Sequence, residues 1–172
     1  EMLGFWSKVE DGTIPTRVTH NDTKINNILF DKDGGVLCAI DLDTVMNSTS
    51  LNDFGDAIRS YANTGEEDDR DLSRVGMSLD MFRAYTEGYL SQRAKQLTAP
   101  EIDHLAFSAR YITFEQVLRF LMDYIDGDTY YKIKYPEHNL VRTRAQYKLL
   151  RSMEEQYGTM CDIVRETVAK YR

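Results

Sequence analysis

Residues 17–31 read RVTHNDTKINNILFD, and this stretch decides how the first part of the chain folds. Both of its ends carry the apolar residues of short strands, whereas the eight residues 20–27 between them are mostly polar. Polar groups that enter a core without partners cost free energy, and loops are where binding and catalytic side chains collect. We therefore expect residues 20–27 to form a loop that presents chemistry between two strands.

The residues around this loop predict a small β element. Short strands are expected at 17–19, 28–30 and 36–40, because these runs are apolar and are bounded by turn-forming residues. A tight turn is expected at 31–35, where the pair Gly34–Gly35 supplies the positive φ that a hairpin needs. The second and third strands should therefore form an antiparallel hairpin.

Beyond residue 53 the apolar residues repeat with the period of helices. Asp53 is a plausible N-cap for the first helix, and the charged loop 65–71 is expected to be solvated. One continuous apolar face on the longest helix should form the central core, and it consists of Phe107, Tyr111, Phe114, Leu118, Leu121 and Ile125. Helices are expected over about 54–61, 79–95, from just after Pro100 to about 126, and 139–170 with a break near Gly158. The predicted fold class is α+β, predominantly α.

The composition excludes some classes of function. A length of 172 residues is sufficient for one domain with a core, and the net charge of −7 argues against a nucleic-acid-binding surface. Cys38 and Cys161 are the two cysteines, which suggests no disulfide framework and fits a reducing, cytoplasmic setting. The sequence has no apolar run of membrane-spanning length. We expect a cytoplasmic protein without nucleic-acid or membrane partners.

The polar loop carries a set of residues suited to phosphoryl transfer. His20, Asp22 and Asn27 have the spacing H-x-D-x-x-x-x-N, and Asp41 follows the next apolar strand. The hairpin reverses the chain, so Asn27 should lie next to Asp41. An amide oxygen and a carboxylate suit Mg²⁺, which takes its remaining ligands from water and substrate phosphates. Asp22 could then orient an attacking hydroxyl or accept its proton.

The segments HNDTKINNILFD and AIDLDTVM resemble the catalytic and metal-binding motifs of the aminoglycoside phosphotransferase and choline kinase superfamily, whose fold is similar to that of protein kinases. The resemblance implies Asp22 as catalytic base, Asn27 and Asp41 as Mg²⁺ ligands, and His20 as a support of the loop. It also implies ATP as co-substrate. Asp43 falls where relatives often carry an acidic residue, which could reach a second metal or the loop.

Further segments look like those of the N-acetylhexosamine kinase group, and they extend the resemblance over most of the chain. They include DFGDAIR, RFLMDYIDGDTYYK and HNLVRTRAQYKLL. This resemblance implies a sugar substrate, phosphorylated at its anomeric hydroxyl. The triplet Asp53-Phe54-Gly55 spells a protein-kinase motif but opens a helix, so we interpret Asp53 as a helix cap or as a group that ties the loop back.

No glycine-rich nucleotide loop occurs in the sequence. The resemblance implies that the β-rich nucleotide lobe would precede residue 1, so residues 1–172 are expected to be the C-terminal catalytic lobe of a longer kinase. Without that partner lobe, we expect weak ATP binding and negligible turnover.

Other candidate residues have two interpretations each. Lys24 either contacts a phosphate or the transition-state charge, or is solvated. Arg119 and Asp123, with Glu115, either line a polar substrate pocket or form an intrahelical ion-pair ladder. Two more groups could contact substrate. For His138, Arg142 and Arg144 the alternative is a charged helix surface, and for Tyr130, Tyr131 and Tyr135 it is packing of the connection onto the helical body.

Two alternatives to a sugar kinase remain open from the sequence. One is a kinase-like binding or regulatory module without catalysis, and the other is a kinase for choline, an aminoglycoside or homoserine. The intact trio of Asp22, Asn27 and Asp41 favours a catalytic protein.

Overall fold

The computed structural model describes residues 2–172, and the side chains from residue 4 onward. It confirms a predominantly helical α+β fold. The strands are β1 Arg17–Thr19, β2 Ile28–Phe30, β3 Val36–Ala39 and β4 Met46–Ser48. The helices are α1 Met2–Glu10, α2 Ser50–Tyr61, α3 Leu79–Arg93, α4 Ala99–Asp103, α5 Leu105–Ile125, α6 His138–Glu155 and α7 Tyr157–Tyr171. None of the described helices has the length and apolar composition to cross a membrane.

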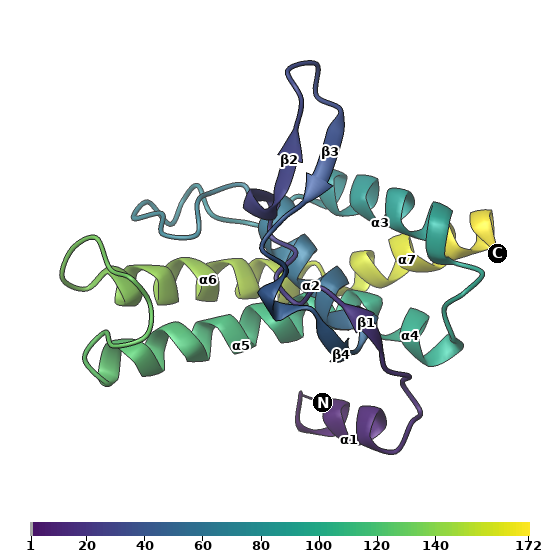
Figure 1. Cartoon of the computed structure of the whole chain (residues 1–172), viewed down its shortest axis with the longest axis horizontal. Coiled ribbons are helices and arrows are strands. Elements are labelled where there is room, and N and C mark those ends of the chain that lie inside the picture. The colour runs from purple at the N-terminus through teal and green to yellow at the C-terminus, as the bar shows by residue number, and fades with distance from the viewer. Residues whose placement is uncertain (1) are drawn as a thin grey trace.

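The helical body is built around α5 and α6, which lie side by side along the long axis of the molecule (Figure 1). Helix α2 packs on α5, and α3 packs on α7. The contact between α2 and α5 is close at Gly55, where an added Cβ would lie 2.5 Å from the backbone oxygen of Ser108. The glycine of the kinase-like triplet therefore serves helix packing.

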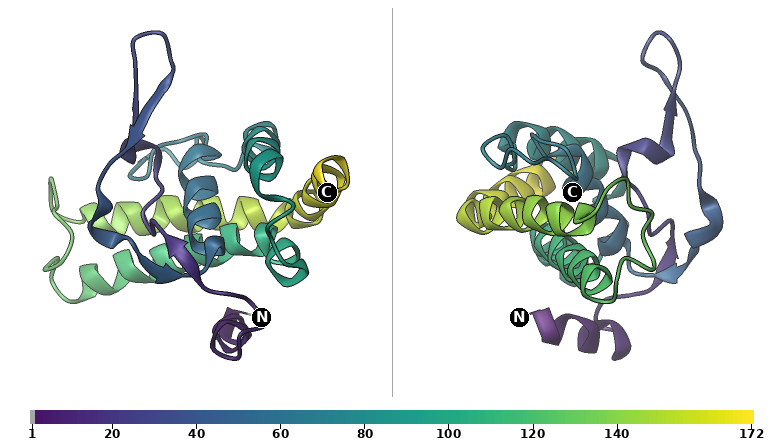
Figure 2. Two further views of the ribbon diagram at one scale, coloured as in Figure 1. Left: turned by 45° about the vertical axis from the view of Figure 1, so that its right-hand side comes forward. Right: turned by 90° about the vertical axis from the view of Figure 1, so that its left-hand side faces the viewer.

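The strands form two small antiparallel pairs. β1 pairs with β4, so that Arg17 lies opposite Ser48, and β2 pairs with β3, so that Ile28 lies opposite Ala39. Gly34 has a φ of 84° in the turn, as the sequence predicted. The β2–β3 hairpin projects from the helical body (Figure 2), and the polar loop precedes it.

Two helix boundaries differ from the expectation. α2 begins at Ser50, before the expected start at Phe54, and its N-cap is Thr49, whose side chain accepts the N–H of Leu51. Asp53 therefore lies in the first turn and is not the cap. The single helix expected after Pro100 is divided at His104, whose φ of −104° and ψ of 2° are not helical, into α4 and α5. A capping box between Thr98 and Glu101 starts α4.

The core-facing side of α5 also differs from the expectation. Leu118 and Ile125 are 42% and 71% exposed, whereas Ala109, Thr113 and Phe120 are buried. Small side chains permit close packing against α2 and α6, and the Thr113 hydroxyl satisfies its hydrogen-bonding requirement by donating to the backbone oxygen of Ala109. The predicted face was therefore wrong at Leu118 and Ile125, whereas Phe107 is 2% exposed in the core and Tyr111 packs against it, as predicted.

Candidate active site

The polar loop is anchored by the carboxylate of Asp53. Its Oδ2 accepts the backbone N–H of His20 at 3.0 Å, and its Oδ1 accepts that of Asn21 at 2.7 Å. The Thr23 hydroxyl donates to the backbone oxygen of Asp53 at 2.7 Å. These contacts confirm that Asp53 ties the loop to α2.

His20 supports the loop from inside, as the resemblance implied. Its Nδ1 accepts the backbone N–H of Asp22 at 3.3 Å, and its Nε2 lies 2.9 Å from the backbone oxygen of Ile40. This pattern fits the arrangement in which Nδ1 accepts and Nε2 donates a hydrogen bond. The Thr44 hydroxyl donates to the backbone oxygen of His20 at 2.6 Å. His20 thus connects the loop to the end of β3.

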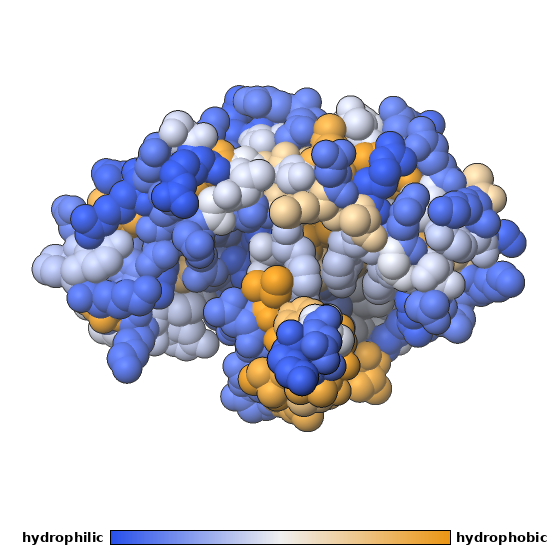
Figure 3. Space-filling view, turned by 90° about the horizontal axis from the view of Figure 1, so that it is seen from above, coloured by the Kyte–Doolittle hydropathy of each residue, from blue (hydrophilic) through white to orange (hydrophobic). Residues whose placement is uncertain are grey.

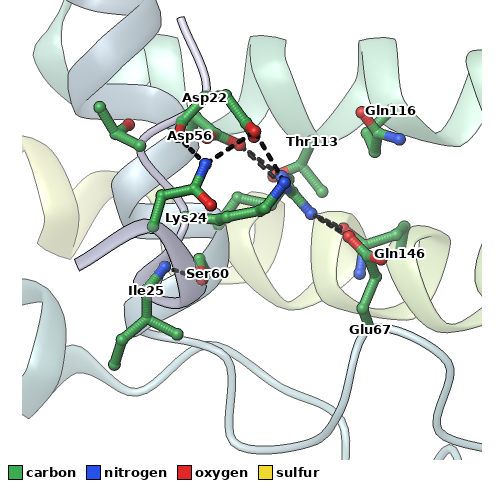
Figure 4. A network of polar contacts seen from close by, with 12 residues as sticks. Asp22, Lys24, Ile25, Asp56, Ser60, Glu67, Thr113, Gln116 and Gln146 are labelled. Atoms are coloured by element: carbon green, nitrogen blue, oxygen red, sulfur yellow. Dashed lines mark hydrogen bonds and ion pairs between the residues drawn. The ribbon is translucent and has the colours of Figure 1, made fainter. Parts of the chain in front are cut away.

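Asp22 is held by two donors from its own loop (Figure 4). Its Oδ2 accepts Lys24 Nζ at 2.7 Å and Asn27 Nδ2 at 2.8 Å. Burial alone would lower the pKa of Lys24, but the hydrogen bond with Asp22 and the charges of Asp22, Asp41 and Asp56 raise it. Lys24 is therefore a charged partner of Asp22 rather than a free surface lysine.

Asn27 and the end of β3 are adjacent, as the hairpin predicted. The backbone N–H of Ile40 donates to the backbone oxygen of Asn27 at 2.9 Å. Both hydrogen bonds of the buried Asn27 side chain use Nδ2. The amide oxygen Oδ1 therefore remains available as a metal ligand. Asp41 is exposed, and its hydrogen bond with Asp43, together with the charge of Asp43, raises its pKa.

Asn27 and Asp41 carry the kind of oxygen atoms that Mg²⁺ prefers as ligands. The residues that the structure describes contain no group of three or more His, Cys, Asp or Glu side chains able to hold a metal ion. The Oδ1 of Asn27 and the carboxylate of Asp41 are oxygen ligands of the hard type. The neighbouring carboxylates of Asp41 and Asp43 also favour the binding of a cation. Mg²⁺ commonly uses one or two protein ligands together with waters and phosphates.

A polar cleft of about 600 Å³ opens beside Asp22, a size typical of small-molecule sites. Asp22 and Lys24 line one side of it, and residues of the 65–68 loop line another. α5, α6 and the connection between them supply Gln116, Arg119, Tyr130, Tyr131, Arg142 and Gln146. The cleft thus joins the polar loop to the two central helices.

The 65–71 loop is largely exposed, as its charges predicted, but some of its carboxylates have partners elsewhere in the chain. Glu67 Oε1 accepts Arg59 Nη1 at 2.8 Å, and Asp68 Oδ2 lies 2.7 Å from Nε2 of the buried His138. Asp69 is itself 8% exposed. Partners on α2 and α6 thus hold Glu67 and Asp68 beside the cleft, which the sequence did not predict, whereas Asp69 pairs with Arg74 nearby in the chain.

Arg119 and Asp123 occupy different environments. Arg119 lines the cleft, where its guanidinium lies 5.8 and 5.5 Å from the ring centres of Tyr130 and Tyr131. Asp123 is buried, and its carboxylate accepts the backbone N–H of both tyrosines and Asn139 Nδ2. The structure therefore brings Arg119 to the cleft, while Asp123 holds the α5–α6 connection and is not among the lining residues.

Sequence reasoning missed a buried charged group in the floor of the cleft. Arg59 on α2 is 6% exposed and contacts Asp56 Oδ1 through Nε at 2.9 Å, in addition to Glu67. Burial lowers the pKa of Arg59, but the charges of Asp56 and Glu67 outweigh this effect and raise it. The i, i+3 spacing of Asp56 and Arg59 in a helix with many apolar residues was the available signal.

Comparison with known protein families agrees with this geometry. Residues 5–87 match the model of a family described as the phosphotransferase enzyme family, which includes aminoglycoside phosphotransferases. The matched range contains the polar loop, the β2–β3 hairpin and Asp41. Members of this family transfer phosphate from ATP to small molecules. Over residues 5–87 the chain is therefore similar to this family of phosphotransferases.

Proposed function

We propose that this chain is the catalytic lobe of an ATP- and Mg²⁺-dependent kinase that phosphorylates a hydroxyl of a sugar such as an N-acetylhexosamine, at the anomeric position. The observation that carries the proposal is the placement of Asp22, which Lys24 and Asn27 hold at the wall of a polar cleft. The end of the hairpin with Asp41 lies beside the same loop.

In this proposal Asp22 is the catalytic base. Its carboxylate accepts the proton of the acceptor hydroxyl or orients that hydroxyl for attack on the γ-phosphate. Lys24 forms an ion pair with Asp22 at 2.7 Å and places a positive charge near the transferred group. His20 supports the loop through its two ring nitrogens.

Asn27 and Asp41 are the proposed Mg²⁺ ligands. When bound, the ion would neutralise charge on the phosphates of ATP. Asp43 and Arg119 are proposed to act on the substrate side, Arg119 from the wall of the cleft. For Asp123, which the sequence also suggested as a substrate residue, the contacts favour a positioning role through the α5–α6 connection.

ATP binding is proposed to require a second, β-rich lobe that covers the hairpin. Leu29, Phe30, Val36 and Leu37 are 42%, 47%, 68% and 62% exposed on this two-stranded element. Figure 3 shows apolar side chains around the projecting hairpin, whose tip is polar. An exposed apolar surface of this kind is typical of an interface with another domain. We therefore expect weak ATP binding and negligible turnover by residues 1–172 alone.

The proposal is tested by incubating the protein that joins this chain to its nucleotide lobe with Mg-ATP and a panel of acceptors. The panel contains N-acetylhexosamines, unmodified hexoses, choline, homoserine and aminoglycosides. Phosphorylation of an N-acetylhexosamine at its anomeric oxygen, identified by phosphorus NMR, is the expected result. Binding of Mg-ATP without transfer to any acceptor would favour the alternative of a regulatory module.

A further inference from the structure

Helix α5 is apolar on two opposite sides. The side that packs on α2 and α6 carries the buried residues Ala109, Thr113, Val117 and Phe120. The opposite side is the outer face of α5, and it carries Tyr111, Phe114, Leu118, Leu121, Met122 and Ile125. Residues two positions apart, such as Tyr111 and Thr113, point about 200° apart around a helix, so the two sets lie on different sides. A helix that is apolar all round is normally buried.

Much of the outer face is nevertheless exposed. Leu118, Met122 and Ile125 are 42%, 61% and 71% exposed, and Phe114 and Leu121 are half-buried. From residue 114 to residue 125 the face is about 17 Å long. Single apolar residues are common on protein surfaces, but a continuous stripe of them along one helix is typical of a surface that another element covers.

Helix α1 covers the beginning of the outer face. The ring centre of Phe5, which is 1% exposed, lies 4.8 Å from the ring centre of Tyr111. The indole N–H of Trp6 donates a hydrogen bond to the hydroxyl of Tyr111, and the two ring centres are 6.3 Å apart. In the right-hand view of Figure 2, α1 lies below α5, whereas α6 lies above it. One end of the outer face thus already binds a helix from the N-terminal side of the chain.

The contacts of α1 also give its direction along α5. Lys8 Nζ lies 2.9 Å from Nε2 of His104, directly before the start of α5, whereas Trp6 lies against Tyr111 in the second turn. The earlier residues of α1 are therefore nearer to the exposed part of the outer face than the later ones. A chain that enters α1 in a longer protein arrives from that side.

The outer face and the β2–β3 hairpin lie on different sides of the molecule. The hairpin projects at the top of Figure 1, whereas α1 lies at the bottom. A nucleotide lobe that covers the hairpin therefore leaves the outer face open, and burial of this face needs a different element.

We propose that the segment directly before residue 1 in the two-lobe protein contains a helix whose apolar side packs on the outer face of α5, next to α1. This inference rests on the proposed function, because it takes the chain as part of a longer kinase. A segment tethered at α1 reaches the face at an effective concentration of about millimolar, which favours it over a second copy of the chain. The catalytic lobe then includes this segment in addition to residues 1–172.

The first test is the melting temperature of the two-lobe protein with Met122→Lys or Ile125→Lys. Both variants should melt about 5 °C or more below the parent, because a lysine charge must enter an apolar contact or release the covering helix. Met81→Lys is the matched control, since Met81 is 51% exposed on α3, away from the outer face. The control should remain within about 2 °C of the parent, as should all three variants of the 172-residue chain alone, where the outer face is open.

The second test identifies the covering element by photo-cross-linking. Photo-methionine, which carries a small diazirine, replaces the methionines of the two-lobe protein, and mass spectrometry locates the cross-linked peptides. Met122 should cross-link to residues directly before residue 1, in a stretch with apolar residues at spacings of three and four. The exposed Met81 should give no cross-link to that stretch.

The inference is overturned if Met122→Lys and Ile125→Lys destabilise the two-lobe protein no more than Met81→Lys does. It is also overturned if Met122 cross-links to the nucleotide lobe or to a second copy, or remains without a cross-link. The outcome for the kinase proposal is separate. A covered outer face without phosphotransfer to any acceptor supports this inference and refutes the kinase, whereas phosphotransfer by a protein whose outer face is open refutes this inference alone.

Discussion

The side-chain nitrogen of Asn27 lies 2.8 Å from both the backbone oxygen and the carboxylate Oδ2 of Asp22. This pair of bonds folds the loop back on itself and joins the proposed base to a proposed metal ligand. Asn27 is 4% exposed, so that the bonds are largely shielded from water. The same side chain thus positions Asp22 through its nitrogen and offers its oxygen to a cation.

Asn27→Asp should therefore destabilise the loop. The substitution preserves the size of the side chain but replaces a donor with a second carboxylate facing Asp22, and the expected loss is about 1–3 kcal/mol in the free energy of unfolding. Urea denaturation of the chain measures it. Asn26→Asp is the control, because it adds the same charge at an exposed neighbour. Equal stability of the two variants would show that the Asn27–Asp22 bond has no structural role.

Gly55→Ala should weaken the packing of α2 on α5. The new Cβ would lie 2.5 Å from the backbone oxygen of Ser108 and 2.8 Å from Ile112 Cγ1, so the helices must separate at a cost of about 1–3 kcal/mol. Gly88→Ala is the matched control in α3, where a Cβ meets nothing within 4 Å. Helix propensity predicts that the control is stabilised by up to about 1 kcal/mol. Thermal unfolding of both variants should give shifts of opposite sign, and shifts of the same sign would contradict the close contact.

Acid should destabilise the chain through Glu101. Burial raises the pKa of this carboxyl, but hydrogen bonds from Arg17, Thr98 and Ser50 outweigh burial and lower the pKa from 4.5 to about 2. Because the folded pKa is depressed, this contribution is complete above pH 4.5 and is lost as the pH falls toward 2. A shift of this size corresponds to about 3 kcal/mol.

The control for this prediction is Glu101→Gln, which cannot titrate. Its free energy of unfolding should be lower at pH 6 and should change less between pH 5 and pH 2 than that of the parent. If the two proteins lose stability in parallel over this range, Glu101 is not the responsible group.

The local features of the site could be predicted from the sequence, because neighbouring residues determine them. The hairpin turn depends on Gly34, and the adjacency of Asn27 to the end of β3 follows from the hairpin. The tie through Asp53 was also anticipated, although the cap of α2 proved to be Thr49. The turn and the hairpin contact depend on short-range chain geometry, whereas the tie through Asp53 joins residues 33 apart.

The floor of the cleft could not be predicted, because it depends on contacts between distant segments. Arg59 meets Gln146 across 87 residues, and Asp68 meets His138 across 70. Periodicity indicates that such residues lie on helices but not which helix faces which. The buried face of α5 was predicted only in part for a related reason: Phe107 is in the core as expected, but Ala109 and Thr113 allow close packing without being large apolar residues.

The most direct test of the central claim is steady-state phosphotransfer by Asp22→Asn in the two-lobe protein, with Asp80→Asn at an exposed position of α3 as the control. Loss of a catalytic base predicts a kcat reduced by about 10²–10⁴-fold with a KM changed only a few-fold, while the control keeps the activity of the parent. A folded Asp22→Asn enzyme that turns over at a rate near that of the parent would contradict the account.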